Sequence, residues 1–373
     1  MPKPFNPIEE AERQLTICNS CRYCEGYCAV FPALERLTHV TEGNTIFLAN
    51  LCHDCRACHQ ACMFTLPHEF AINLPAALSE VRVTTYSTYA WPRAFAALAR
   101  RAGVSTLGFV LAGLLLALMT VAATGGLARF FDTGGDPGSF YRVIPYLVLA
   151  VSGLAASAYI VLVMVLGSIR FWREAGGTKR EALDLGAWIA AMGDVAIMAN
   201  LRGGGDNCYQ PDPRRASPAR RLLHQAVVYG FILAFISTGL AALFQDILGE
   251  QPPFPWLSAP VVTGALGGVM MTVGCTGLLW LKLRSVAKAR DLISGSMLSM
   301  DTAFIVVLDA AAITGLLTLL LRDTGALATM LTIHLATLVA LYATAPYGKF
   351  VHVVYRFGAL LKNRAEQRAE LNP

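Results

Sequence analysis

Eight of the ten cysteines in this 373-residue chain lie in two runs that share one spacing. The runs are Cys18-x2-Cys21-x2-Cys24-x3-Cys28 and Cys52-x2-Cys55-x2-Cys58-x3-Cys62. Three thiolates at this spacing can hold three corners of a cubane iron–sulfur cluster. The fourth cysteine of such a run normally ligates the other cluster in two-cluster ferredoxins. We therefore predict two [4Fe-4S] clusters, one held by Cys18, Cys21, Cys24 and Cys62, and the other by Cys52, Cys55, Cys58 and Cys28.

Structural zinc is the main alternative for these cysteines. Zinc ribbons usually separate two CxxC pairs by a longer spacer, so a duplicated run of four favours iron–sulfur clusters. Disulfides are not expected, because residues 1–12 are polar and lack the apolar region of a signal peptide. Ala29 and Met63 stand where ferredoxins often place proline, and residues 41–51 favour a helix. We therefore expect a mainly helical two-cluster head over residues 1–90.

The rest of the chain is strongly apolar. Hydrophobic residues make up 55% of the sequence and charged residues only 15%, with a mean hydropathy of +0.50. These values argue against an ordinary soluble enzyme, a disordered protein or a nucleic-acid binder. Six apolar runs are long enough to cross a bilayer, which takes about 20 residues each. They lie at 104–123, 143–168, 222–244, 258–281, 300–321 and 326–346.

The positions of Lys and Arg give the runs an orientation. If the N-terminus is cytoplasmic, the inside segments hold 27 of the 30 lysines and arginines. This asymmetry follows the positive-inside rule, so we expect six spans in a bacterial inner membrane with both termini cytoplasmic. The net charge of +5 then faces the inner leaflet and does not imply nucleic acid.

Two histidines in the membrane part are candidate haem ligands. A haem held between helices needs two imidazoles at similar depth on facing helices. His224 and His352 are both expected near the cytoplasmic face. His334 lies 18 residues before His352, about 27 Å away along one continuous helix. We therefore predict one haem b with His224 and His352 as its axial ligands.

This placement assumes that the last span continues as a helix past Pro346 to about residue 361, with a kink. Arg220 and Arg221 lie just outside the third span and are expected to neutralise the haem propionates. Tyr229, Lys349 and Arg356 could also line the site. The alternative is a pair of interfacial histidines without haem. The cluster head favours haem, because electrons that reach the membrane need an acceptor.

Asp309 and His334 are both expected near the middle of the membrane. An ionisable group at that depth is costly and is usually paired or functional. We expect the two side chains to form a buried pair that serves a proton path or a quinone pocket. A purely structural pair is the alternative. Asp301 lies nearer the surface and is expected to cap a helix.

Four segments together resemble one family, the tricarballylate utilisation protein B or CitB-domain family. They are Cys18 to Cys28 with its Glu25-Gly26-Tyr27, Cys52-His53-Asp54-Cys55-Arg56-Ala57-Cys58, Arg220-Arg221-Leu222-Leu223-His224, and Pro346-Tyr347-Gly348-Lys349-Phe350-Val351-His352. The resemblance covers nearly the whole chain. It implies a membrane iron–sulfur and haem protein that reoxidises a separate cytoplasmic FAD-dependent tricarballylate dehydrogenase and passes the electrons to quinone.

Two further resemblances keep alternatives open. A related arrangement fuses such a module to a flavoprotein of cobalamin synthesis that forms precorrin-3B, which makes that flavoprotein a second candidate donor. The spans also look like the cytochrome b subunit of respiratory nitrate reductase, which holds two haems. Its second histidine in the earlier helix is replaced here by Ala234, so the resemblance implies one haem and leaves His334 without an axial partner.

The expected architecture is all-α. It comprises the head at 1–90, transmembrane helices 1 and 2 at 104–168, a cytoplasmic connecting segment at 169–221, transmembrane helices 3 to 6 at 222–361 and a polar tail at 362–373. No GxGxxG motif follows a strand, so flavin is expected on a partner and this chain is expected to transfer electrons. The rival class is a six-span transporter or anchor with a metal-binding head, which would need more intramembrane polar groups than Asp309 and His334.

Overall fold

The computed structural model describes all residues except 1–5, 96–101, 204, 206, 289–293 and 372–373. The ends of the predicted head and tail, at 1–5 and 372–373, thus lie outside the described residues. The described residues form helices and no named strand, with one isolated bridge between Cys208 and Ser217. The all-α prediction is confirmed. Six helices are long and apolar enough to cross a membrane, as predicted.

Five short helices build the head. They are α1 (Pro7–Cys21), α2 (Val30–Glu35), α3 (Glu42–Leu51), α4 (Ala57–Ala61) and α5 (Leu74–Tyr89). Polar caps start three of them: the side chains of Asn6, Thr41 and Asn73 accept hydrogen bonds from first-turn backbone amides. The helix expected over residues 41–51 is therefore present, and Thr41 is its N-cap. Leu15, Phe47 and Leu78 are among the fully buried residues of the core between these helices.

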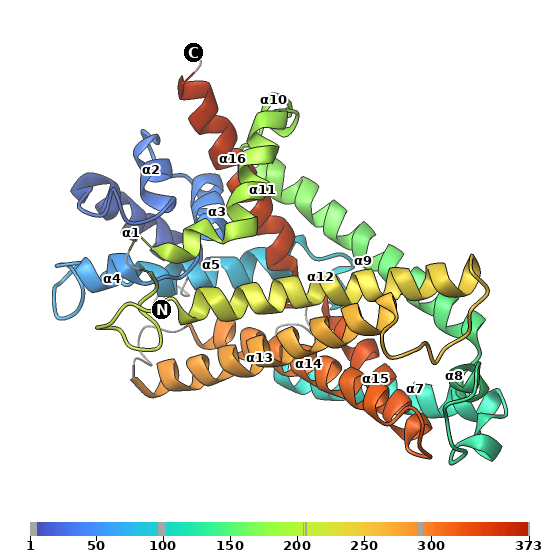
Figure 1. Cartoon of the computed structure of the whole chain (residues 1–373). Helices are drawn as coiled ribbons and strands as arrows, with labels where there is room; N and C mark the ends of the chain where they lie inside the picture. The colour runs from blue at the N-terminus through green and yellow to red at the C-terminus, as the bar shows by residue number, and fades with distance from the viewer. Residues whose placement is uncertain (1–5, 96–101, 204, 206, 289–293, 372–373) are drawn as a thin grey trace.

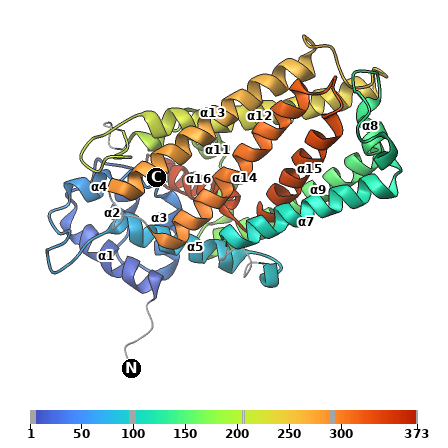
Figure 2. The same ribbon diagram turned by 90° about the horizontal axis from the view of Figure 1, so that it is seen from below.

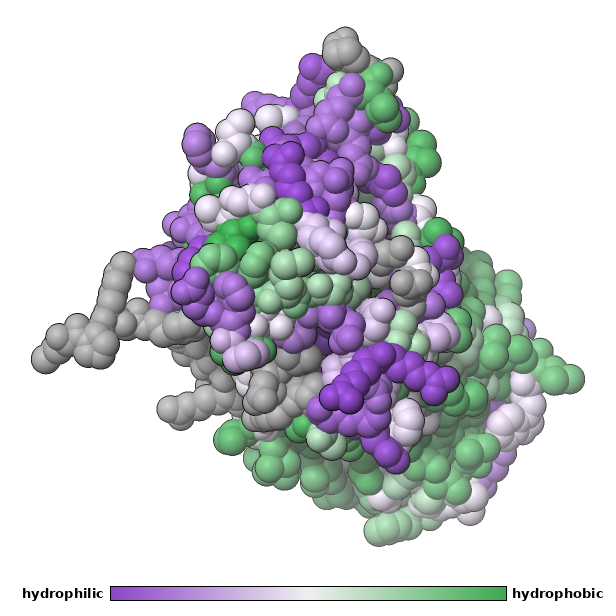
Figure 3. Space-filling model, turned by 90° about the vertical axis from the view of Figure 1, so that its left-hand side faces the viewer, coloured by the Kyte–Doolittle hydropathy of each residue, from purple (hydrophilic) through white to green (hydrophobic). Residues whose placement is uncertain are grey.

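The six membrane helices are longer. They are α7 (Ala102–Ala123), α9 (Tyr146–Glu174), α12 (Ala219–Asp246), α13 (Ala259–Lys288), α14 (Gly295–Leu320) and α15 (Leu327–Thr344). They extend between the head at one end and the short helices η1 (Gly126–Arg129) and α8 (Ser139–Val143) at the other, as Figures 1 and 2 show. The surface agrees with this division. Figure 3 looks at the head end and shows hydrophilic residues gathered there, with hydrophobic surface below and behind.

Helices α12 and α13 form a close hairpin because glycines face each other. A Cβ atom added to Gly230 would lie 2.7 Å from the carbonyl oxygen of Gly267, and one added to Gly267 would lie 2.7 Å from that of Gly230. Small residues let the backbones of membrane helices approach closely, and dispersion contacts then hold them together. This contact fixes the position of α12, which carries His224.

The last membrane helix does not continue past Pro346. Helix α15 ends at Thr344, the short turn η4 (Lys349–Val351) follows, and α16 (His352–Leu371) is a separate helix. The expected kinked but continuous helix is therefore wrong. Proline removes a backbone donor and clashes with the preceding turn, and the carbonyl of Thr344 accepts instead from the amides of Tyr347 and Gly348. The distance of about 27 Å from His334 to His352 along one helix no longer applies.

Helix α16 packs against the head and the connecting segment. That segment forms α10 (Lys179–Ala182), α11 (Leu185–Ile197) and η2 (Ala199–Arg202). Arg364 and Arg368 on α16 pair with acidic residues of the segment, Asp194 at 2.6 Å and Asp184 at 3.0 Å. Arg36 in the head pairs with Glu366 of α16 at 2.9 Å. The polar tail expected from residue 362 onward thus continues α16 as far as Leu371 and contacts the head.

Candidate metal centres

The first cavity in the head is lined by cysteines from both runs. Its empty volume is about 380 Å³, and four cysteines contact it: Cys18, Cys21, Cys24 and Cys62. Cys18 and Cys21 lie in the last turn of α1, which ends because Arg22 adopts a left-handed backbone conformation with φ of 56°. Cys62 follows the end of α4. The walls between the thiols are mostly apolar, with Ile17, Phe31 and Phe64 among them.

The second cavity holds the other four cysteines. Its empty volume is about 400 Å³, and it is lined by Cys28, Cys52, Cys55 and Cys58. The loop after α3 reverses direction because Asp54 and Arg56 both have left-handed φ values, 53° and 66°. The backbone amide of Asp54 lies 3.5 Å from the sulfur of Cys52 and donates to it. Backbone amides that point at sulfur are typical of iron–sulfur ligation.

The two cavities divide the eight cysteines in the same way as the crossed assignment made from the sequence. Burial raises the pKa of the Cys18 thiol, and of the Cys55 thiol, to about 12, so the thiolate form needs a bound cation. Within the described part of the chain no three His, Cys, Asp or Glu side chains converge on a point that suits a single ion. Four thiols spaced around a cavity instead fit a cluster, whose ligands sit on separate corners.

The two cavities differ in their access to solvent. Beside the first cavity Tyr23 is 59% exposed and Met63 is 63% exposed, whereas Cys55 in the second is only 6% exposed. The segment after the 203–205 glycines covers the second cavity. There the amide of Tyr209 donates to the carbonyl of Cys55 at 2.8 Å, and the Gln210 side chain donates to the carbonyl of Asp54 at 2.8 Å. The first site is therefore the outer one and the second the inner one.

His224 and His352 come together beside the head. Their ring centroids lie 6.2 Å apart and their planes are nearly perpendicular, at 86°. Two metal–nitrogen bonds of about 2 Å each, plus the distance from each nitrogen to its ring centre, give a separation of roughly 6 Å. The pair predicted from the sequence is thus adjacent, although His352 opens a separate helix. This spacing fits a metal between the two rings.

The hydrogen bonds and protonation of the two imidazole rings also suit metal binding. Nδ1 of His352 donates to the carbonyl of Lys349 at 2.6 Å, which leaves Nε2 free of a proton to act as a ligand. Burial, followed by the charges of Lys349 and Arg356, holds the pKa of His352 well below its ordinary value. The imidazole is therefore neutral, which is the form that binds a metal. Nδ1 of His224 is buried without a hydrogen-bond partner.

Two arginines connect the histidine pair to the inner cysteine loop. Arg220 lies one turn before His224 and donates to the carbonyls of His53 at 2.9 Å and Asp54 at 2.7 Å. Arg356 lies one turn after His352 and donates to the carbonyl of Cys52 at 2.9 Å. The loop outside α3 leaves these carbonyls without helical partners, and the guanidinium groups satisfy them.

Arg220 thus contacts the cysteine loop through its NH1 group, and its expected role at the haem propionates stays a prediction. Arg221 keeps a buried Nε without a partner, so it is the arginine that remains for an acidic group such as a propionate. Lys349 pairs with Asp301 at 2.8 Å. The Tyr229 hydroxyl donates to the carbonyl of Ala196 at 2.7 Å and so holds α11 against α12.

Asp309 and His334 do not form the expected pair. Asp309 accepts a hydrogen bond from Thr276 on α13 at 2.8 Å, whereas Nδ1 of His334 lies 3.1 Å from the Thr314 hydroxyl on α14. Five residues separate Asp309 from Thr314, which places the two on different faces of α14. Equal depth in the membrane was the basis of the prediction, and depth does not fix rotation about the helix axis.

Asp301 and Arg82 have roles that the sequence analysis missed. Asp301 does not cap α14, whose N-cap is Ser294; it lies between Lys282 at 2.5 Å and Lys349 at 2.8 Å. Arg82 is buried and donates to the carbonyls of Ala49 at 2.9 Å and Cys52 at 3.2 Å. A signal for Arg82 was available, because its helical spacing puts it on the buried face of α5 with Leu78, Tyr86 and Tyr89.

Comparisons with known proteins agree with both parts of the structure. A family model described as citrate utilization protein B matches residues 97–372, and a model for the Fer4-like domain of that protein matches residues 11–88. The chain is also 39% identical over 364 residues to the citrate utilization protein B of Escherichia coli, covering 97% of this chain and 93% of that protein. No solved structure matches the chain.

Proposed function

The chain belongs to the citrate utilization protein B family, and we propose from this premise that it is the membrane electron-transfer subunit of a tricarboxylate-utilising system. The family membership implied by the sequence motifs is thereby confirmed. The family match gives a Fer4-like head, and the structure gives six helices able to cross a membrane. We propose the cofactors, the electron donor and the electron acceptor in addition.

The observation that carries the proposal is the order of three candidate centres. The outer cysteine cavity lies beside exposed residues, the inner one is lined by the buried Cys55, and Arg220 and Arg356 link the His224–His352 pair to the inner cysteine loop. When bound, two [4Fe-4S] clusters and one haem b would each carry a single electron, which splits the electron pair of a reduced flavin into separate steps.

Three arginines position the inner cysteine loop and surround it with positive charge. Arg82, Arg220 and Arg356 all donate to backbone carbonyls of residues 49–54, so they fix the cysteine loop relative to α5, α12 and α16. Their charges also place positive potential around the inner site. Net charge and hydrogen bonding tune the potential of an iron–sulfur centre, so this setting favours the reduced form there.

The proposed donor is a cytoplasmic FAD-dependent dehydrogenase of the tricarballylate type, and the proposed acceptor is quinone in a bacterial inner membrane. The solvent-facing outer cavity supports entry from a soluble partner. The distribution of Lys and Arg supports a cytoplasmic head and cytoplasmic termini. The relative in Escherichia coli is named for citrate utilization, and citrate and tricarballylate are both tricarboxylates.

Purification in detergent under anaerobic conditions tests the proposal. We expect about eight non-haem iron and eight sulfide per chain together with one haem, a broad iron–sulfur absorbance, and Soret and alpha peaks that sharpen on reduction by dithionite. Electron paramagnetic resonance of the reduced protein should show two interacting clusters. A preparation that folds but is colourless, or that carries zinc in place of iron, would overturn the proposal.

A further inference from the structure

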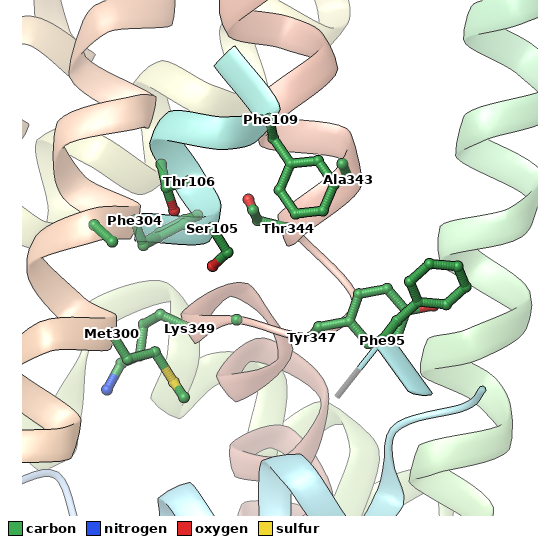
Figure 4. Close-up of a pocket in the computed structure, with 12 residues that line it drawn as sticks. Phe95, Ser105, Thr106, Phe109, Met300, Phe304, Ala343, Thr344, Tyr347 and Lys349 are labelled. Carbon is green, nitrogen blue, oxygen red and sulfur yellow. The ribbon is translucent and has the colours of Figure 1, made fainter. Parts of the chain in front are cut away.

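A third cavity lies inside the membrane part, next to the histidine pair. Its empty volume is about 440 Å³, part of which is open to the surroundings of the protein. Figure 4 shows its walls, which come from α7, α14, the end of α15 and the turn before α16. Phe95, which precedes α7, closes one side. The cavity therefore sits where the break at Pro346 opens space between the helices.

The lining suits a flat apolar ring that carries polar oxygens. Phe109 and Phe304 supply aromatic surface, and Thr106 supplies a hydroxyl. The phenol group of Tyr347 is engaged outside the cavity, since it contacts the Tyr159 hydroxyl and donates to the carbonyl of Trp91. Its ring therefore acts as wall. Apolar surface with a few convergent polar groups is the usual make-up of a ligand site.

Among the twelve described residues that line the cavity, Lys349 is the only charged one. Its ammonium group contacts Asp301 at 2.8 Å and the sulfur of Met297 at 3.1 Å. An ammonium group has three donors, so one N–H remains for a further acceptor. Asp301 also pairs with Lys282. The carboxylate that holds Lys349 in place is therefore shared between two lysines.

The cavity is joined to the histidine pair through Lys349 itself. The carbonyl of this lysine accepts the Nδ1 proton of His352 at 2.6 Å. A ligand that contacts the side chain of Lys349 is therefore linked to a candidate axial ligand through Lys349 alone. On the other side, α7 presents exposed apolar residues such as Val104 and Leu107 beside Ser105 and Thr106. A lipid-soluble ligand can reach the cavity along that face.

We propose that this cavity binds the ring of a membrane quinone and that Lys349 donates a hydrogen bond to one of its carbonyl oxygens. The inference rests on the proposed function, whose acceptor it locates. Each quinone takes up two electrons, which originate in the reduced flavoprotein and arrive one at a time, and two protons from the aqueous phase, and leaves as quinol. The site replaces the one expected at Asp309 and His334, neither of which lines this cavity.

Two substitutions on one helix test the site. Ala303→Phe fills the cavity from α14, whereas Val306→Phe adds the same ring at a position of α14 that is 46% exposed. We reduce each purified protein with dithionite and follow its reoxidation by decylubiquinone in a stopped-flow spectrometer. We expect Ala303→Phe to slow reoxidation at least tenfold and Val306→Phe to change it less than twofold.

A binding readout separates this inference from the proposed function. A photoreactive azidoquinone should label peptides that contain residues 105–109 or 343–349 in the wild type, and Ala303→Phe should lose that label. Wild-type rates and labelling in Ala303→Phe would overturn the site, even if the protein carries its clusters and haem. A wild type without iron–sulfur or haem absorbance fails the proposed function instead. Lys349→Arg should keep reoxidation within about threefold, and Lys349→Met should not.

Discussion

The imidazole ring of His224 faces that of His352 at a centroid distance of 6.2 Å, and each histidine lies one helical turn from an arginine that binds the inner cysteine loop. The two arginines approach the loop from different helices, α12 and α16. The relation between the metal-binding head and the histidine pair is therefore set by direct side-chain contacts across the boundary of the membrane part.

His224→Ala and His352→Ala should each abolish haem retention, whereas His334→Ala should spare it. The first two remove one of a pair of facing ligands, and the third removes a ring that contacts the Thr314 hydroxyl on α14. The haem content per chain after purification measures this, with iron and sulfide as the control for an intact head. Loss of haem in His334→Ala alone would contradict our placement.

Cys62→Ser should damage the cluster of the first run, although Cys62 belongs to the second. The reason is that Cys62 lines the cavity of Cys18, Cys21 and Cys24. Cys28→Ser is the matched change, and it should damage the other cluster. We expect each variant to lose one of two cluster signals in electron paramagnetic resonance. Uncrossed ligation predicts the opposite pairing of variant and lost signal.

The sequence predicted the elements well, because apolar length and cysteine spacing are local properties. Six spans, the helix at 41–51 and the pairing of His224 with His352 needed only the distances along the chain and the sidedness of each span. The break after Thr344 was not predicted. Pro346 allows either a kink or an interruption, and the choice depends on whether α16 gains more by packing on the head, through Arg364 and Arg368, than by continuing α15.

The Asp309–His334 pairing failed for a physical reason. The two residues were matched by depth, which ignores the rotation of each side chain about its helix. The contacts made by Arg220 were also absent from the sequence-based expectation. The contacts of Arg220 depend on a loop more than 160 residues earlier in the chain, whose carbonyls have no visible signature in the sequence. Long-range contacts of this kind decide which polar neighbour a charged side chain meets.

Arg356→Gln should make the potential of the inner cluster more negative. The substitution removes a positive charge and the donor to the carbonyl of Cys52. Loss of that charge disfavours the reduced state. We expect a shift of roughly 60 mV, which is a tenfold change in the equilibrium constant of a one-electron couple. Redox titration followed by electron paramagnetic resonance measures it.

Arg13→Gln is the control, because Arg13 pairs with Glu10 on the outer surface of α1 and should leave the inner potential unchanged. An unchanged potential in Arg356→Gln, with haem and both clusters present, would show that this arginine positions the loop without tuning the potential of the inner cluster. Arg356→Lys separates the two effects, since it keeps the charge but loses the forked donor geometry.

Gly267→Leu should loosen the α12–α13 hairpin and, through it, the haem site. A Cβ atom at Gly267 lies 2.7 Å from the carbonyl oxygen of Gly230 and 3.0 Å from the amide nitrogen of Ala234, so a side chain there forces the two backbones apart. Overpacking of this kind costs about 1–3 kcal/mol. Gly239→Leu on α12 is the matched control, because a Cβ atom there meets no atom within 4 Å.

Thermal unfolding in detergent measures the first effect of Gly267→Leu, and the haem occupancy measures the second. We expect a lower midpoint for Gly267→Leu and a partial loss of haem, because α12 carries His224 while His352 stays with α16 on the head. The contents of non-haem iron and sulfide should not fall, since the arginines and α5 hold the inner loop without α13. A stability equal to that of Gly239→Leu, with full haem, would mean that the helices can separate without moving His224 away from His352.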